Sequence, residues 1–182
     1  MQRTNHRRKT SYQRRRGLTN GRSRSAIPVA IIGAAVVMFG LLIYQALRPR
    51  PGMAMPDLGN EHIVYPQTAV YNSTPPTSGP HYESLAQWGI HTQPIPNELQ
   101  VHNLEDGGVM VQYSCPEGCP EIVDALAGIV ERYYTQVILA PYPDMEARIA
   151  LTSWERLDTF EAFDEARIVR FIEAYRGIDH HR

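Results

Sequence analysis

Cysteine, lysine and the common catalytic motifs are scarce in this sequence of 182 residues. It holds two cysteines and, among its eighteen basic residues, one lysine. Two cysteines exclude a disulfide-rich scaffold and a zinc site built from four cysteines. There is no Gly-x-Ser-x-Gly motif and no glycine-rich phosphate loop, so nothing indicates a serine hydrolase or a phosphate-binding enzyme. The sequence therefore supports no particular enzymatic activity. Its content of 43% apolar residues is sufficient for a folded core.

Acidic residues are absent from the first 56 positions. That segment holds eleven Arg or Lys residues, whereas residues 57–182 hold seven Arg residues and all nineteen acids, a formal charge of −12. A domain of this charge repels phosphate, so nucleic acid is not expected as its partner. The near-neutral total therefore conceals a basic arm joined to an acidic domain.

A long uncharged run separates the two halves. Residues 26–47 carry no charge, and a helix of this length, at about 1.5 Å per residue, covers the roughly 30 Å hydrocarbon core of a bilayer. We predict an uncleaved single-pass transmembrane helix at 26–47. A cleaved signal peptide ranks lower because its apolar core is about 7 to 15 residues long, and a twin-arginine export signal at residues 14–16 also ranks lower.

The flanking charges predict the orientation of this helix. Nine basic residues lie among the first 24, so residues 1–25 are predicted to be a disordered cytoplasmic arm under the positive-inside rule. Residues 48–59 are rich in Pro, Gly and Met and are predicted to be an extended linker. Residues 60–182 then form an extracytoplasmic domain outside the cell membrane, where a disulfide can persist.

The periodicity of residues 60–182 predicts an α+β domain with a small mixed sheet covered by two helices. The expected strands are 62–68, 108–114, 136–141 and 147–154, and the expected helices are 121–134 and 164–176. Because few residues separate the last two strands, they are expected to form an antiparallel hairpin. Residues 71–100 are rich in proline and are expected to form an ordered loop packed by its aromatic side chains.

The two cysteines follow the strand expected at 108–114. In Tyr-Ser-Cys-Pro-Glu-Gly-Cys-Pro-Glu, residues 113–121, Cys115 and Cys119 lie at the start of a helix, where the helix dipole lowers the pKa of a thiol. Two thiolates and an imidazole suit copper(I). Two other interpretations stay open: a structural disulfide, and thiol–disulfide exchange, which ranks lower because the spacing is wider than the Cys-x-x-Cys of thioredoxins.

This segment is similar to the Cys-Pro-x-x-Cys-Pro loop of Sco-type copper-delivery proteins. Those proteins are membrane-anchored domains that face outward. The similarity is confined to the loop, and it implies a copper site in which a distant histidine is the third ligand.

Five longer segments carry a second resemblance. They are residues 75–82 (PPTSGPHY), 88–89 (WG), 101–109 (VHNLEDGGV), 138–145 (ILAPYPDM) and 149–154 (IALTSW). In this order they resemble the bacterial family called domain of unknown function 3105. The resemblance implies an N-terminal anchor and an outward domain, but no established activity. The central motif of the family reads His-Asn-Leu-Glu-His-Gly-Gly, and here Asp106 replaces the second histidine.

Besides the two cysteines, polar residues within these segments form a second candidate site. His81 follows a Ser-Gly-Pro turn, and His102, Glu105 and Asp106 precede a Gly-Gly pair. A turn held by two glycines brings such residues into one pocket. That pocket is either a metal or proton-transfer site or a buried hydrogen-bond network. Other histidines are expected at the surface: His62, His180 and His181.

These patterns together predict a single-pass membrane protein whose outward domain binds a metal, copper first, in metal delivery or storage. The predicted ligands are Cys115, Cys119, His81, His102, Glu105 and Asp106. The alternative is an accessory or scaffolding subunit of a membrane protein complex, with a structural disulfide and no metal.

Overall fold

The structure, a computed structural model, describes residues 26–46, 49–143 and 145–181 and divides the chain into two compact units, 1–48 and 49–182. The predicted cytoplasmic arm, residues 1–25, lies outside the described residues. Helix α1 (Ala26–Ala46) occupies the predicted transmembrane segment. Among the residues described, we find no helix that combines the length and the apolar character needed to cross a membrane, so the span stays a prediction.

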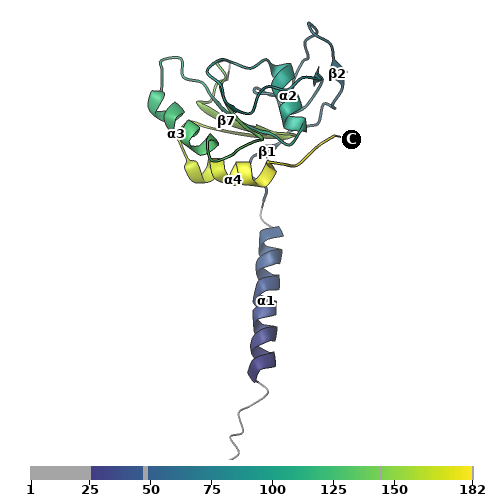
Figure 1. Ribbon diagram of the computed structural model, residues 1–182, viewed down its shortest axis with the longest axis vertical. Coiled ribbons are helices and arrows are strands. Elements are labelled where there is room, and N and C mark those ends of the chain that lie inside the picture. Colours follow the sequence, from purple (N-terminus) through teal and green to yellow (C-terminus); the bar gives the residue numbers. More distant parts are fainter. Residues whose placement is uncertain (1–25, 47–48, 144, 182) are drawn as a thin grey trace, which may run out of the picture. The chain divides into compact units, whose positions relative to one another are not determined.

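The second unit is built on one mixed sheet of six strands (Figure 1). The strand order is β1-β8-β7-β5-β6-β4. The bounds are β1 (Met53–Ala54), β4 (Gly89–Ile90), β5 (Val109–Tyr113), β6 (Val137–Pro141), β7 (Ile149–Ser153) and β8 (Arg156–Phe160). Strands β4, β6 and β5 run parallel, and β7, β8 and β1 each pair antiparallel with a neighbour. The predicted α+β class with a mixed sheet is confirmed.

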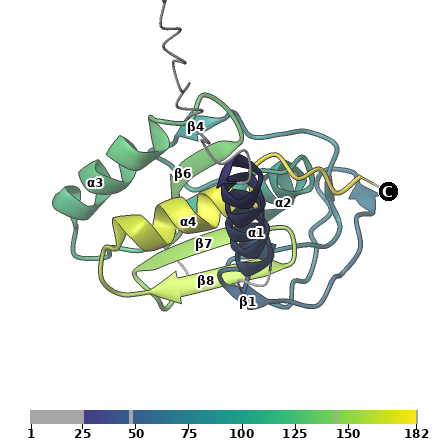
Figure 2. The same cartoon turned by 90° about the horizontal axis from the view of Figure 1, so that it is seen from below.

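Helices cover both faces of this sheet. They are α2 (Asn97–Glu105), α3 (Pro120–Val130) and α4 (Glu165–Tyr175). Figure 2 shows α3 and α4 next to each other on one face, and their buried side chains share one apolar cluster with β5, β6 and β7. The opposite face packs against α2 and the segment before it. The sheet is therefore buried on both sides.

Strand β5 shows why both faces are apolar. Val109 and Val111 belong to the cluster with α3 and α4, whereas Met110 belongs to the cluster with α2 and Trp154. Alternate side chains of a strand point to opposite faces, so a strand between two layers needs apolar residues at successive positions. This explains the continuous apolar runs that mark β5 and β6 in the sequence.

The structure corrects the expected hairpin of residues 136–141 and 147–154. Strand β7 does not pair with β6; it pairs antiparallel with β5 and with β8. The prediction was wrong because a short connection permits a hairpin without requiring one, and β5 already occupies the inner edge of β6. Strand β8 itself was missed.

The segment between residues 60 and 100 also differs from expectation. Only His62–Ile63 of the strand expected at 62–68 pairs, as β2, with β3 (His81–Tyr82), in a separate two-stranded parallel ladder. The peptide between Tyr65 and Pro66 is cis. Residues 71–100, expected to be a loop, contain β3, β4 and the start of α2.

The segment expected to be a linker, residues 48–59, belongs in large part to the domain. Met53 and Ala54 form β1 on the outer edge of β8. The hydroxyl of Tyr175 donates to the carbonyl of Pro51 at 2.6 Å. The outer edge of β8 supplies backbone hydrogen-bond partners for β1. This pairing holds the segment against the sheet.

Candidate metal site at a histidine cluster

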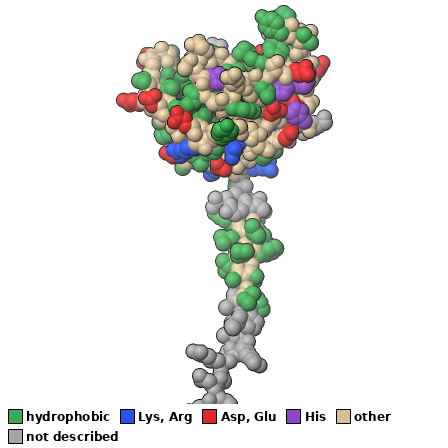
Figure 3. Space-filling model, viewed as in Figure 1, with side chains coloured by type: hydrophobic (Ala, Val, Ile, Leu, Met, Phe, Trp, Pro, Cys, Tyr) green, Lys and Arg blue, Asp and Glu red, His purple; other side chains and the backbone are tan. Residues whose placement is uncertain are grey.

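Two short strands, one helix and the C-terminal segment converge on a cluster of imidazoles and carboxylates. Strand β2 contributes His62 and β3 contributes His81, which face each other in register. Helix α2 contributes His102 and Glu105. Asp106 at the end of α2 and His181 after α4 complete the cluster. Figure 3 shows histidine side chains beside acidic ones on one side of the domain.

Two glycines allow the C-terminal segment to reach this cluster. Gly107 has a φ of +76°, and a Cβ on it would lie 2.7 Å from the backbone nitrogen of Ile178. The amide of Gly177 donates to the Gly107 carbonyl at 2.8 Å, and the amide of His180 donates to the Glu105 carbonyl at 2.8 Å. A side chain at residue 107 would displace this segment, so the glycine positions His181 at the site.

The carboxylate of Glu105 is the centre of the cluster. Its Oε2 lies 3.1 Å from Nε2 of His81, 3.4 Å from Nε2 of His181 and 3.9 Å from Nε2 of His62. Asn60 donates from Nδ2 to the other oxygen, Oε1, at 2.6 Å. The side chain of Glu105 is 1% exposed. Three imidazoles therefore turn the same nitrogen towards one buried oxygen.

The opposite ring nitrogens fix the positions of the protons. Nδ1 of His81 donates to the carbonyl of Gly79 at 2.8 Å, and Nδ1 of His102 donates to the carbonyl of Tyr82 at 2.6 Å. A carbonyl oxygen only accepts, so in each neutral ring the proton is on Nδ1 and Nε2 presents a lone pair. Burial lowers the pKa of His81, which favours its neutral form.

The cluster offers two overlapping sets of donor atoms. Candidate ligand atoms of His62, His81 and His102 lie within 4.8 Å of one another, and so do those of His102, Glu105 and His181. The rings of His62 and His102 are stacked with centroids 5.2 Å apart, and Nε2 of His102 is 3.9 Å from Oδ1 of Asp106. Imidazole and carboxylate groups at these separations are typical ligands of divalent transition metals.

The cysteines lie elsewhere. Cys115 and Cys119 form a disulfide with a Cα–Cα distance of 5.7 Å, so in this state they offer no thiolate. Neither candidate ligand set in the described part of the chain includes a cysteine. The reason is topological: Glu105 precedes β5 and Cys115 follows it, and a strand of five residues separates its ends by about 17 Å. The structure does not bring the predicted cysteine and histidine ligands together.

Four of the predicted ligands do meet, namely His81, His102, Glu105 and Asp106. His62 and His181 lie at the surface, as expected, with side chains about half exposed. Their approach to Glu105 was not predicted. No local motif links either histidine to α2, because the contacts depend on strand pairing and on the path of the chain after α4.

These observations define the class of the protein: it is an α+β domain that carries a cluster of histidines and carboxylates. The family model described as "Protein of unknown function (DUF3105)" matches residues 62–181, and the chain belongs to this family. The matched range begins at His62 and ends at His181, so it contains all the histidines of the cluster. No curated protein and no solved structure matches the chain. The similarity of the cysteine loop to Sco-type proteins stays a local resemblance.

Proposed function

We propose that this protein binds a divalent transition-metal ion at the histidine cluster and acts in metal delivery or storage. The ligands would be drawn from His62, His81, His102, His181, Glu105 and Asp106. The domain would face outward from the cell membrane, to which α1 anchors it.

The observation that carries this proposal is the orientation of the rings. His81 and His102 each donate Nδ1–H to a backbone carbonyl, and Nδ1 of His181 lies 2.7 Å from Oδ1 of Asp179. Metal-bound histidines typically donate their second nitrogen to an oxygen in this manner, which fixes the tautomer and aims the lone pair. A network that served only packing would have no need to gather several ring nitrogens around one buried carboxylate.

The donor chemistry favours copper in its divalent form. Imidazole and carboxylate ligands suit Cu²⁺ and Zn²⁺, and a site of this kind generally binds Cu²⁺ more tightly than the other divalent ions of the first transition row. Copper(I) prefers sulfur ligands, which would require reduction of the disulfide first. We therefore place Cu²⁺ first and Zn²⁺ second at the histidine cluster.

Metal titration of the full-length chain tests this proposal. After treatment with a chelator, the chain without a histidine tag should bind about one Cu²⁺ ion in isothermal titration calorimetry, and the His102→Ala variant should lose that binding. His91→Ala is the matched control, because Nε2 of His91 donates to the nearby carbonyl of Gln87 at 2.7 Å and His91 belongs to neither candidate ligand set. Equal binding by the wild-type chain and His102→Ala would contradict the proposal.

The proposed anchor rests on the sequence, in which residues 26–47 carry no charge. The described side chains of α1, from Ile31 to Tyr44, are exposed. Protease added to intact spheroplasts should digest the chain from residue 57 onward and spare residues 1–25. Protection of the domain together with loss of the arm would reverse the orientation.

A second candidate function is that of an accessory subunit. The segment between β2 and β3 exposes large apolar side chains, among them Val64, Tyr65 and Val70, the last 91% exposed. Side chains of this kind grouped on one segment are typical of a contact with another protein. If this function is correct, a Val64→Asp and Tyr65→Ser double variant should migrate as a smaller species than the wild-type chain when membrane extracts are separated on native gels. Identical migration would exclude this segment as the contact.

A further inference from the structure

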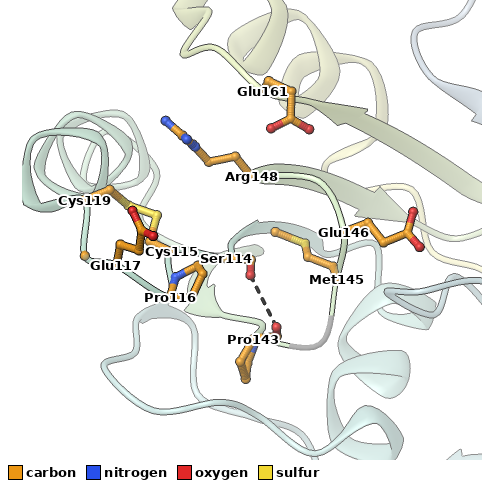
Figure 4. A pocket seen from close by; sticks show the side chains of 11 residues that line it. Ser114, Cys115, Pro116, Glu117, Cys119, Pro143, Met145, Glu146, Arg148 and Glu161 are labelled. Atoms are coloured by element: carbon orange, nitrogen blue, oxygen red, sulfur yellow. Dashed lines mark hydrogen bonds between the residues drawn. A yellow bond between two sulfur atoms is a disulfide. The ribbon is translucent and has the colours of Figure 1, made fainter.

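A second site lies beyond the far end of β5, where the disulfide of Cys115 and Cys119 borders a cavity of about 400 Å³. Figure 4 shows the disulfide on one wall of this cavity, with Met145 and Glu146, from the connection between β6 and β7, on the other side. Both cysteines are partly exposed, and the three residues between them are exposed. The loop that carries the bridge is therefore open to a partner molecule.

The bridge contributes little to holding the fold together. It joins residues four positions apart, and closing so short a loop removes little entropy from the unfolded chain. The amide of Gly118 already closes the turn by donating to the Cys115 carbonyl at 3.0 Å, and the amide of Ser114 donates to the Arg148 carbonyl at 3.0 Å. Neither cysteine belongs to the apolar clusters of the described domain.

The start of α3 makes the two sulfur atoms unequal. Cys119 is the residue before the first turn of α3, and its side chain caps no backbone N–H. The dipole of α3 stabilises a thiolate at Cys119, and Arg148 in the cavity wall adds a positive charge. A stabilised thiolate is the better leaving group, so attack on the bridge falls on Cys115.

We propose that this disulfide is an exchange site that oxidises a dithiol on a partner protein. A partner thiolate attacks Sγ of Cys115, the bond between the two sulfur atoms breaks, and Cys119 leaves as a thiolate. The second partner thiolate then attacks the partner sulfur of the mixed disulfide and releases Cys115. Two electrons pass to the cysteine pair, two protons from the partner dithiol protonate it, and the two partner sulfur atoms become joined.

The charge around the cavity specifies the partner. Glu117, Glu146 and Glu161 line it together with Arg148, and the domain as a whole is strongly acidic. Charges of this sign attract a basic segment and repel an acidic one during encounter. The partner is therefore a protein whose cysteines are flanked by Lys or Arg.

Two synthetic dithiol peptides of equal length test the inference on the full-length chain. One carries Lys and the other Glu beside its cysteines. At low ionic strength the Lys peptide should reduce the disulfide at least about tenfold faster, and added salt should diminish the difference. Equal rates would overturn the assignment of a basic partner. Reduction by neither peptide, while dithiothreitol reduces the unfolded chain, would show a purely structural bridge.

Two single variants test the assignment of the sulfur atoms. The thiol of Cys119 in Cys115→Ser should be alkylated by iodoacetamide at lower pH than the thiol of Cys115 in Cys119→Ser. The reverse order would overturn the assignment of Cys119 as the leaving group. Because neither cysteine belongs to the histidine cluster, a double variant that carries both Cys115→Ser and Cys119→Ser should bind Cu²⁺ as the wild-type chain does, so a failure here is distinguishable from a failure of the proposed metal site.

Discussion

His81 and Glu105 meet at two atoms that both accept hydrogen bonds when the ring is neutral and the carboxylate is ionised. Nε2 of His81 lies 3.1 Å from Oε2 of Glu105, while Nδ1 of the same ring bonds to the carbonyl of Gly79. A lone pair and a carboxylate oxygen repel each other unless a cation or a proton lies between them. Because His81 is fully buried, water cannot easily relieve this repulsion. The contact therefore requires either a shared proton or a bound cation, and the metal ion proposed for the site would supply the cation.

Replacing Glu105 with Gln should separate the metal site from the fold. The new amide can donate to Nε2 of His81 while its oxygen still accepts from Asn60, so both of these contacts are satisfied without a cation. We expect the melting temperature of the metal-free chain to stay the same or rise, and the affinity for Cu²⁺ to fall at least about tenfold. Circular dichroism and calorimetry measure the two quantities. An unchanged affinity would show that Glu105 is not a ligand.

Asn60 should act as a positioning residue for Glu105. Its Nδ2 donates to Oε1 at 2.6 Å and leaves Oε2 for the imidazoles. Removal of such an outer partner typically weakens metal binding by about 10- to 100-fold, and we expect that loss for Asn60→Ala. Asn72→Ala is the matched control, because Asn72 donates to the carbonyl of Pro56 on an exposed part of the domain. If both variants bind metal equally well, the hydrogen bond to Glu105 has no role in the site.

The second glycine after α2 should tolerate no side chain. A Cβ on Gly108 would lie 2.3 Å from the carbonyl oxygen of Asn103 and 2.8 Å from the ring of Trp88. We expect Gly108→Ala to lower the free energy of unfolding by about 1 to 3 kcal/mol. Gly128→Ala, on α3 with open space around its Cβ, should raise it by up to about 1 kcal/mol. Urea denaturation distinguishes the two, and an equal effect would contradict the close approach at Gly108.

Trp154 should be among the most costly side chains to remove. It is buried in the apolar cluster with α2, and the ring of His180 stacks on it at 5.9 Å. We expect Trp154→Ala to cost about 3 to 5 kcal/mol of unfolding free energy. Tyr134→Ala is the control, because Tyr134 is 99% exposed and its loss should change stability by no more than about 0.5 kcal/mol. A small effect at Trp154 would mean that the side chain is not part of the core.

The start of the domain can be tested by truncation. A chain that begins at Asp57 should fold cooperatively, because the central strands and all three helices of the domain remain. It lacks β1 and the carbonyl of Pro51 that pairs with the buried hydroxyl of Tyr175. An unpaired buried group costs about 1 to 3 kcal/mol, so a chain that begins at Pro49 should be more stable by at least that amount. Equal melting temperatures would support the flexible linker instead.

The elements that sequence periodicity predicts are those that bury apolar side chains in a regular pattern. Strand β5 and helix α4 are examples, and their predicted and observed bounds differ by one residue at each end. Helix α2 escaped prediction because many of its buried side chains are polar. Asn103 is fully buried, yet its amide both donates to and accepts from the backbone of Ala86. A helix buried through hydrogen bonds leaves no apolar stripe in the sequence.

The candidate site could be predicted only in part for a similar reason. His102 and Glu105 lie three positions apart on one helix, so their proximity follows from local geometry. The approach of His62 depends on the register between β2 and β3, and that of His181 depends on a hydrogen bond between Gly177 and Gly107. Contacts between residues so far apart in the chain are properties of the folded domain and leave no trace in residue spacing.

The two-residue strands at the margins of the sheet affect the tendency of the domain to aggregate at high concentration. An open strand edge can recruit the backbone of a neighbouring molecule and start aggregation. Here β4 covers part of β6, and β1 covers the first residues of β8. The rest of β8 carries Asp158 in an ion pair with Arg167, and charge at an edge discourages such pairing. The sheet is thereby protected against edge-to-edge polymerisation, and concentrated solutions of the domain should stay free of fibrils.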